Sequence, residues 1–176
     1  IGENLKLIKP TFVAAVPRIF EKLYNKIVSG AQEGSKLKYR IFRWALEVGQ
    51  EVSALSQRGL EPKGTLRLKS AMANMLVFSR IKDRLGGELK FFISGSAPLS
   101  YDIATFFHAA GILILEGYGL TESSAASFVN RPDNYKFGTV GKPVPGVEFK
   151  LAEEDDEILL KGRGIMRGYY NLPDKT

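Results

Sequence analysis

A hydroxyl and a carboxylate stand side by side near the middle of the chain, within the six-residue run GYGLTE. The Thr121 hydroxyl could donate a hydrogen bond to a phosphate oxygen, and Glu122 offers the hard oxygen ligands that Mg²⁺ prefers. Gly117 and Gly119 would let a ligand approach the backbone closely, and the ring of Tyr118 offers a flat face on which a base could stack. A structural alternative fits the same residues equally well, namely a strand-to-helix turn in which Thr121 is the N-cap.

The segments around this run form a strand–loop–helix–strand pattern. Residues 89–94 and 112–115 are apolar and predict buried strands, and residues 100–110 between them predict a helix. This order predicts two parallel strands with a right-handed crossover. Ligands bind at the carboxyl ends of the strands in open α/β sheets, so the loops predicted at 94–99 and 116–122 should share one functional edge.

The first half of the chain is predicted to be mainly helical. A β-rich segment over 11–16 is expected to be a buried strand that Pro17 ends, followed by a helix over 18–29. The longest helical pattern covers 36–57, and another helix is predicted over 65–85. Two apolar sets are expected to face inward on these two helices: Leu37, Ile41, Trp44, Val48, Val52 and Leu55 on the first, and Leu68, Met72, Met75 and Leu76 on the second.

After about residue 136 the pattern changes to short segments separated by glycine and proline, which predicts a β-rich region. Residues 147–151 alternate between apolar and polar types, and residues 157–161 do so more loosely. The acidic run 153–156 between them predicts the solvated turn of a β-hairpin, in preference to a metal site.

Four motifs, in order, resemble those of the superfamily that contains acyl-CoA synthetases, peptide-synthetase adenylation domains and luciferases. The run YGLTE resembles the adenylate-binding motif, and SGSAPL at 94–99 resembles the adenine-side loop that precedes it. Residues 138–146 and 162–171 resemble the next two motifs of the family. Four ordered motifs over 94–176 make this resemblance far more specific than YGLTE would be alone.

The resemblance implies a role for each motif residue. Thr121 would contact the α-phosphate of ATP and Glu122 would coordinate Mg²⁺, so these two are the expected catalytic residues. Tyr118 would stack on the adenine of ATP or AMP. The remaining residues expected to line the nucleotide are Gly95, Ser96, Ala97, Gly117 and Gly119.

The first half of the chain resembles the long-chain members of this family. Residues 16–20, VPRIF, are similar to their gate motif, in which an aromatic residue closes the fatty-acid tunnel, and Phe20 stands at that position. The family's gate residue is often tryptophan, so Phe20 as core filler is an alternative of equal weight. The helical insert over about 36–85 is also typical of long-chain members.

The resemblance therefore implies an α/β fold of the acyl-CoA synthetase type. A parallel-sheet subdomain with flanking helices would cover 1–135, and a β-rich barrel subdomain would begin over 136–176. The implied reaction is that of a long-chain fatty acid–CoA ligase, in which ATP activates a fatty acid to acyl-AMP and coenzyme A then takes the acyl group. The family's phosphate loop, ribose-binding aspartate and catalytic lysine are not among these residues, so we expect an internal fragment that is inactive, or nearly so, by itself.

Composition narrows the alternatives. These 176 residues contain no cysteine, which excludes disulfides and cysteine nucleophiles, and the single histidine, His108, excludes a multi-histidine metal site. The net charge of +6 is interpreted as a solvated basic surface, and no nucleic-acid partner is expected. Two alternatives stay open: a fatty acyl-AMP ligase that feeds a carrier protein, and a noncatalytic module that binds a membrane surface or a protein. The expected location is cytoplasmic, with peripheral membrane contact left open, and the oligomeric state is unknown.

Overall fold

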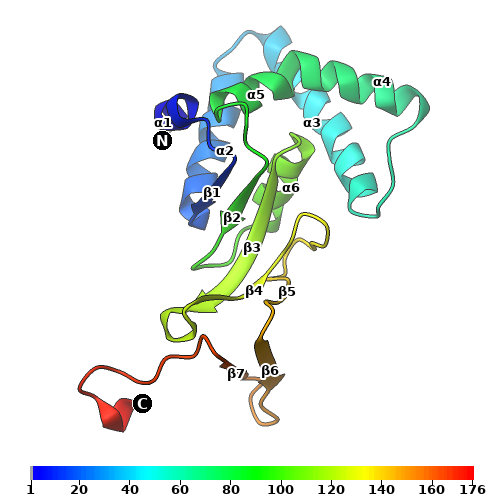
Figure 1. Cartoon of the computed structure of the whole chain (residues 1–176). Helices are drawn as coiled ribbons and strands as arrows, with labels where there is room; N and C mark the ends of the chain where they lie inside the picture. Colours follow the sequence, from blue (N-terminus) through cyan, green and yellow to red (C-terminus); the bar gives the residue numbers. More distant parts are fainter. Residues whose placement is uncertain (1) are drawn as a thin grey trace. The chain divides into compact units, whose positions relative to one another are not determined.

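A computed structural model of the chain describes residues 2–176 and shows two compact units. Unit 1 extends to Ile114, and unit 2 covers Leu115–Thr176. Unit 1 combines helices with parallel strands, and strands dominate unit 2, so the predicted α/β class is confirmed (Figure 1). The subdomain boundary near residue 136 stays a prediction. In the described part of the chain, no helix combines the length and the apolar character needed to cross a bilayer.

Unit 1 places helices around a short parallel sheet. Its helices are α1 (Gly2–Ile8), α2 (Pro17–Gln32), α3 (Lys36–Ser56), α4 (Gly64–Ala73), the π-helical segment η1 (Asn74–Phe78), α5 (Ser79–Arg84) and α6 (Tyr101–Ala109). Strand β1 (Phe12–Ala15) pairs in parallel with β2 (Phe91–Ser94), from Phe12 opposite Phe91 to Ala15 opposite Ser94. Strand β3 (Leu113–Leu120) begins in this unit and follows β2 in the strand order, so β2, α6 and β3 form the predicted strand–helix–strand sequence.

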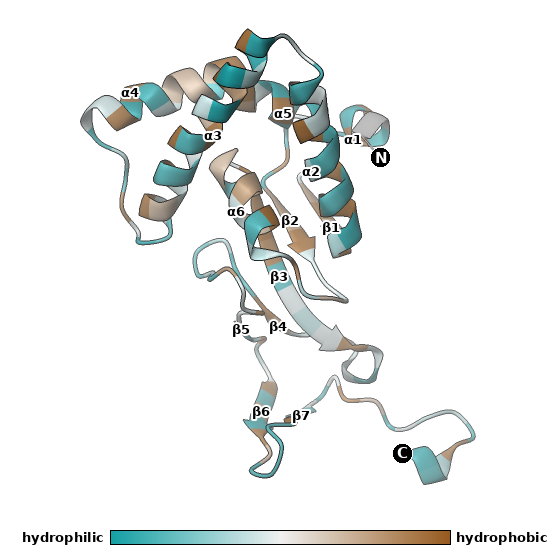
Figure 2. Ribbon diagram, turned by 180° about the vertical axis from the view of Figure 1, so that it is seen from behind, coloured by the Kyte–Doolittle hydropathy of each residue, from teal (hydrophilic) through white to brown (hydrophobic). Residues whose placement is uncertain are grey.

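Three phenylalanines from three different elements form the centre of unit 1. Phe20 of α2, Phe92 of β2 and Phe107 of α6 are each no more than 1% exposed. The ring of Phe20 meets that of Phe92 edge-on, with centroids 5.1 Å apart, and that of Phe107 at 6.3 Å. Figure 2 shows β2 in the hydrophobic colour, as expected for a strand that supplies the core. Each edge-to-face pair stabilises the fold by about 0.5–1.5 kcal/mol beyond the contribution of the apolar area that it buries.

Strand β1 and helix α2 differ from the sequence-based expectation in three ways. Strand β1 was expected to be buried, but its residues alternate between exposed and half-buried, and Phe12 is 57% exposed. Helix α2 begins at Pro17, because proline fits the first helical position, where no backbone N–H is needed. The helix also continues past residue 29, where the predicted helix ended, and ends at Gln32.

Helix α3 ends one residue before the end of the predicted helix over 36–57, and its predicted buried face is confirmed at Val48. The buried residues are Phe42, Ala45, Val48, Gly49 and Ser53, whereas Leu37 of the expected stripe is 65% exposed. Small residues explain the rotation of the face. A Cβ at Gly49 would lie 2.3 Å from the carbonyl oxygen of Ala109, so α6 approaches α3 where α3 has no side chain.

The predicted helix over 65–85 is a continuous helical stretch interrupted by a π turn, and its expected buried face was wrong. Leu68, Met72, Met75 and Leu76 are all exposed, and the buried residues are Ala73, Phe78, Ile81 and Leu85. The step of five residues from Ala73 to Phe78 matches the i→i+5 hydrogen bonding of η1. A period of 3.6 residues therefore cannot be continued through residues 74–78, whereas the exposure of Leu68 and Met72, which precede this turn, has no such explanation.

Unit 2 contains antiparallel strands and short turns. Its further elements are η2 (Thr121–Ser123), β4 (Ala125–Val129), β5 (Lys142–Pro143), β6 (Val147–Leu151), β7 (Ile158–Gly162) and η3 (Pro173–Lys175). Strand β4 pairs with both β3 and β5, and β6 and β7 form the predicted hairpin. The expected loop at 116–122 was wrong, because β3 continues to Leu120, and β4 was not predicted.

Candidate functional site

The residues Thr121 and Glu122 lie on a one-turn helix that directly follows β3. Buried hydroxyls fix this turn: Ser123 Oγ accepts a hydrogen bond from the backbone N–H of Leu120 at 3.1 Å, and Ser127 Oγ donates to Ser123 Oγ at 2.9 Å. The N-cap position belongs to Leu120, so the alternative that made Thr121 the N-cap was wrong. The side chain of Thr121 is therefore not used in capping, and its residue is exposed.

Gly119 has a structural reason of its own to be glycine. The pairing of β3 with β4 shifts register between Tyr118 and Gly119, which brings β4 unusually close. A Cβ at Gly119 would lie 1.7 Å from the carbonyl oxygen of Ala125, and one at Gly117 would lie 3.3 Å from that of Phe128. The close approach of β4 therefore accounts for Gly119 without a ligand, and the proposed nucleotide contact of both glycines stays a prediction.

The backbone after the turn is strained. Ser124 and Ala125 both have positive φ angles, 58° and 98°, in a region that favours glycine. Such residues cost on the order of 1–3 kcal/mol each and persist where the surroundings hold them. One such restraint is a hydrogen bond of 2.6 Å that Ser124 Oγ donates to the carbonyl oxygen of Gly164.

A distant segment, residues 164–169, holds the turn from outside, and we call it the clasp. Besides the Ser124 bond, the backbone N–H of Met166 donates to the carbonyl oxygen of Glu122 at 2.8 Å. The hydroxyl of Tyr169 donates to Glu122 Oε1 at 2.6 Å. Sequence analysis identified this motif but assigned it no role, and it missed Tyr169 as a partner of Glu122.

The clasp also sets the charge of Glu122. The hydrogen bond from Tyr169, and secondarily one from the backbone N–H of Glu122 itself, hold the pKa of the Glu122 carboxyl below its ordinary value. The same bond, together with desolvation and the nearby negative charge, raises the pKa of the Tyr169 phenol. Glu122 is therefore an ionised carboxylate at neutral pH, and Tyr169 is a neutral hydrogen-bond donor.

The donors at this turn fit a magnesium ion bound together with phosphates. No group of three or more acidic or histidine side chains that could hold a metal occurs among the described residues. Mg²⁺ is usually bound through one or two carboxylates plus substrate phosphates, so the single carboxylate of Glu122 beside the Thr121 hydroxyl fits that pattern. The assignment of Glu122 to Mg²⁺ stays a prediction.

Tyr118 is half-buried and rests on β4. Its ring centroid lies 6.0 Å from that of Phe128, with the planes tilted by 56°, and Phe128 also meets Phe149 at 5.0 Å. Phe128 is itself buried, so it gives the Tyr118 ring a firm support. Stacking of adenine on this ring stays a prediction.

The second predicted nucleotide-binding segment, residues 95–97, lies in unit 1 as the loop after β2. Ser96 and Ala97 are exposed, and Ser96 has a positive φ of 70°. The backbone N–H of Gly95 donates to the carbonyl oxygen of Ala15 at 3.3 Å, which ties the loop to the end of β1. Directly before the loop, the Ser94 hydroxyl is buried and is without a hydrogen-bond partner among the described residues. An unsatisfied buried hydroxyl typically costs about 1–3 kcal/mol, and sequence analysis did not single out Ser94.

Two further side chains of unit 1 are Phe20, which is buried, and His108, which is half-buried. Phe20, the candidate gate residue, is 0% exposed within the aromatic centre, a position suited to the core-filler alternative, and its gating role stays a prediction. His108 Nδ1 lies 2.6 Å from Ser53 Oγ, which also accepts a hydrogen bond from Gln57 Nε2 at 3.1 Å. Burial lowers the pKa of the His108 imidazole. These contacts support a structural role for His108.

Comparisons with known proteins point to one family. The family model of the AMP-binding enzymes matches residues 3–170. The chain is 39% identical over 172 residues to the long-chain-fatty-acid–CoA ligase FadD15 of Mycobacterium tuberculosis, a match that covers 98% of this chain and 28% of that protein. It is 35% identical over 190 residues to long chain acyl-CoA synthetase 4 of Arabidopsis thaliana, covering 99% of this chain and 27% of that protein.

Among solved structures, a benzoate CoA ligase from Burkholderia xenovorans LB400 matches at a TM-score of 0.46 and 30% identity, over 50% of this chain and 20% of that one. The chain thus spans less than a third of the length of the curated relatives that it matches.

Proposed function

This chain belongs to the family of AMP-binding enzymes, and from that premise we propose that it forms the nucleotide-binding part of an ATP-dependent fatty acid–CoA ligase. The names of its relatives, which are long-chain-fatty-acid–CoA ligases and acyl-CoA synthetases, support a fatty acid as the substrate. The four ordered motifs over 94–176 support the same assignment. The acceptor is proposed to be coenzyme A, with a carrier protein as the alternative.

The proposed reaction has two steps. The carboxylate of the fatty acid attacks the α-phosphorus of ATP, the bond from that phosphorus to the β-bridging oxygen breaks, and pyrophosphate leaves with acyl-AMP remaining. The thiol of coenzyme A, on losing its proton, then attacks the acyl carbon and displaces AMP to give the thioester. The first step increases negative charge around the α-phosphate, so the site must supply hydrogen bonds and positive charge there.

The residues of this chain would divide that work. The Thr121 hydroxyl would donate a hydrogen bond to an α-phosphate oxygen, and the Glu122 carboxylate would hold the metal. Mg²⁺, when bound, would neutralise phosphate charge. Tyr169 would keep Glu122 oriented and ionised, Tyr118 would stack on the adenine, and the backbone of the 95–97 loop would line the base.

One observation carries this proposal: an ionised carboxylate and an exposed hydroxyl occupy adjacent positions on a turn that hydrogen bonds fix from both sides. The buried Ser123–Ser127 pair fixes the turn from within, and the clasp fixes it from outside. A preorganised donor set of this kind stabilises developing charge without reorganising during the reaction. If Thr121 were the N-cap, its hydroxyl would be used in a backbone hydrogen bond and could not take this role.

A chimera tests the proposed function. The segment of the Mycobacterium tuberculosis ligase FadD15 that aligns with this chain is replaced by the chain, and circular dichroism first establishes that the chimera is folded. We expect pyrophosphate release and acyl-CoA formation that require both ATP and palmitate, as in the unmodified host. A folded chimera that binds fatty acid but releases no pyrophosphate from ATP would contradict the proposal.

A further inference from the structure

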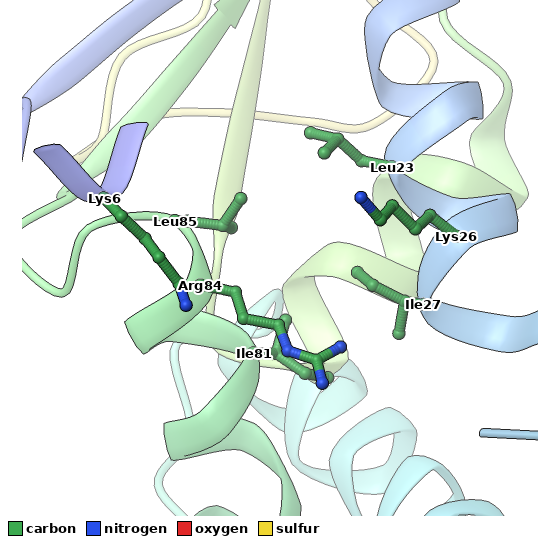
Figure 3. A pocket seen from close by; sticks show the side chains of 7 residues that line it. All are labelled: Lys6, Leu23, Lys26, Ile27, Ile81, Arg84 and Leu85. Carbon is green, nitrogen blue, oxygen red and sulfur yellow. The ribbon is translucent and has the colours of Figure 1, made fainter. Parts of the chain in front are cut away.

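A pocket of about 340 Å³ lies between α1, α2 and α5 in unit 1 (Figure 3). Its floor is apolar and buried, since Ile81 and Leu85 are 7% and 3% exposed. Leu23 and Ile27 of α2 form half-buried walls. Ligand pockets typically measure about 300–1,000 Å³, so this one has room for a small apolar body.

Three cationic side chains surround this apolar space, and each comes from a different helix. They are Lys6 of α1, Lys26 of α2 and Arg84 of α5, and all three are exposed. Among the described residues that line the pocket none is acidic, and none of the three cations forms an ion pair with a described side chain. Figure 3 shows the Lys26 ammonium and the Arg84 guanidinium extending across the space between the helices. An anion at this rim would relieve the repulsion among the three positive charges.

The pocket is separate from the loop of unit 1 that is proposed to line adenine. Helix α2 begins at Pro17, close to the end of β1 to which the Gly95 backbone is hydrogen-bonded. Lys26 lies nine residues further along, which is about 13 Å along the axis of a helix with a rise of 1.5 Å per residue. The pocket therefore lies towards the far end of α2, and none of the residues that are given a role in the proposed reaction lines it.

We propose that this pocket binds a small amphiphilic anion, namely a carboxylate with a short unbranched apolar chain. The chain would lie on the floor of Ile81 and Leu85, and the carboxylate would be held at the rim, where the planar guanidinium of Arg84 can bind both carboxylate oxygens. A purely apolar ligand would leave the three cations uncompensated, and an inorganic anion would leave the apolar floor unused. An amphiphile satisfies both parts of the pocket, and this site needs neither ATP nor the turn at Glu122.

Equilibrium dialysis of the 176-residue chain against decanoate, without nucleotide, tests this site. Decanol and decyltrimethylammonium are matched ligands with the same chain and a neutral or a positive head group. The test variant is K26Q/R84Q. Its control, K22Q/R80Q, removes the same charge one helical turn earlier on the same two helices, at residues that do not line the pocket.

We expect one saturable decanoate site that binds about tenfold more weakly in K26Q/R84Q and unchanged in K22Q/R80Q, as charge-assisted hydrogen bonds require. Affinity should also fall about fourfold for each methylene removed from the ligand, because each buried CH₂ contributes to binding. Equal binding by the two double variants, equal binding of decanol, or no saturable binding below the micelle concentration would each overturn the proposal. Because every substituted residue is exposed, melting curves of both variants should match that of the wild type.

Discussion

Phe20 in unit 1 and Glu122 in unit 2 are both candidate functional residues, yet the structure holds them by different kinds of interaction. Phe20 is 0% exposed and packs against the rings of Phe92 and Phe107. A phenyl ring has no hydrogen-bonding group, so packing alone holds it. Glu122 is held by two hydrogen bonds from the clasp, one to its backbone and one to its carboxylate. Packing fixes the first position and hydrogen bonding fixes the second.

This difference separates stability from chemistry. Removing a packed ring leaves a cavity, which lowers the free energy of unfolding of the whole unit. Removing one exposed hydrogen bond changes mainly the orientation and charge of a single carboxylate. Substitutions in the aromatic centre should therefore change the free energy of unfolding. Substitutions at the turn and the clasp should change chemistry while leaving that free energy nearly constant.

The largest expected effect on stability is that of Phe20→Ala. Truncating a buried phenylalanine typically costs about 3–5 kcal/mol, because the surroundings only partly fill the cavity. Phe12→Ala is the matched control, since Phe12 is 57% exposed on β1 and should lose much less. Urea unfolding measures both. A loss at Phe20 no larger than that at Phe12 would show that the aromatic centre does not hold unit 1 together.

A smaller loss is expected from Gly119→Ala. The new Cβ would meet the carbonyl oxygen of Ala125, so β4 must move, and overpacking of this kind typically costs about 1–3 kcal/mol. Gly30→Ala has the opposite expected sign, because nothing lies within 4 Å of its Cβ position on α2 and alanine favours helix by about 0.5–1 kcal/mol. If both substitutions destabilise equally in urea unfolding, the close approach of β4 is not what requires Gly119.

The free energy of unfolding should also depend on pH through His108. Burial lowers the pKa of the folded imidazole, whereas the unfolded chain titrates near pH 6.5. The unfolded state therefore binds more protons as the pH falls through about 6.5, and stability should decrease there until the folded group also titrates. In His108→Gln the free energy of unfolding should change less between about pH 7.5 and 6 than it does in the wild type. A wild-type stability that rises on acidification through this window would contradict a half-buried histidine whose pKa is lowered by desolvation.

The smallest expected effect on stability is that of Tyr169→Phe, which should act on charge instead. Without the phenol, the pKa of the Glu122 carboxyl should rise toward its ordinary value. Stability gained from a lowered carboxyl pKa is present above the unfolded pKa and is lost as the pH falls through the folded one, so the variant should lose less stability on acidification.

The control for this prediction is Tyr170→Phe, the same change at a neighbouring residue that is 92% exposed. Carboxyl-carbon NMR titration of a chain labelled at glutamate follows the pKa directly. Identical Glu122 titration curves in the two variants would show that Tyr169 does not lower the pKa of the Glu122 carboxyl.

Local signals in the sequence predicted the elements better than they predicted how those elements pack. The bounds of α3 follow from its apolar period and from Ser35, whose hydroxyl accepts a hydrogen bond from the backbone N–H of Lys38 as an N-cap. Val48 of its buried face was predicted, but Ala45 and Gly49 were missed because they pack by being small, and an apolar stripe gives weight to large residues. In the next helical stretch the cause is different, because the π turn at Asn74–Phe78 shifts the buried face of the residues that follow it.

At the candidate site, too, the sequence predicted residues that lie close together in the chain but not contacts between residues far apart in it. Thr121, Glu122 and Tyr118 could be singled out from residue types and from the resemblance, because their chemistry lies within five residues. The bond between Tyr169 and Glu122 spans 47 residues, and no local pattern indicates which hydroxyl will reach a given carboxylate. The orphan hydroxyl of Ser94 depends on burial, which residue type alone does not reveal for serine.

The central claim is that Glu122 acts on phosphate charge, and Glu122→Gln in the chimera tests it most directly. Glutamine keeps the size of the side chain but removes the negative charge that would hold the metal. The matched control is Glu148→Gln, at an exposed carboxylate of β6 whose partner is Lys161. We expect palmitate-dependent pyrophosphate release to fall by about 10²–10³ in the Glu122 variant, with melting unchanged, and to stay near the parent value in the control. Pyrophosphate release by a folded Glu122→Gln chimera that stays within about twofold of the control, a difference worth less than 0.5 kcal/mol, would contradict the claim.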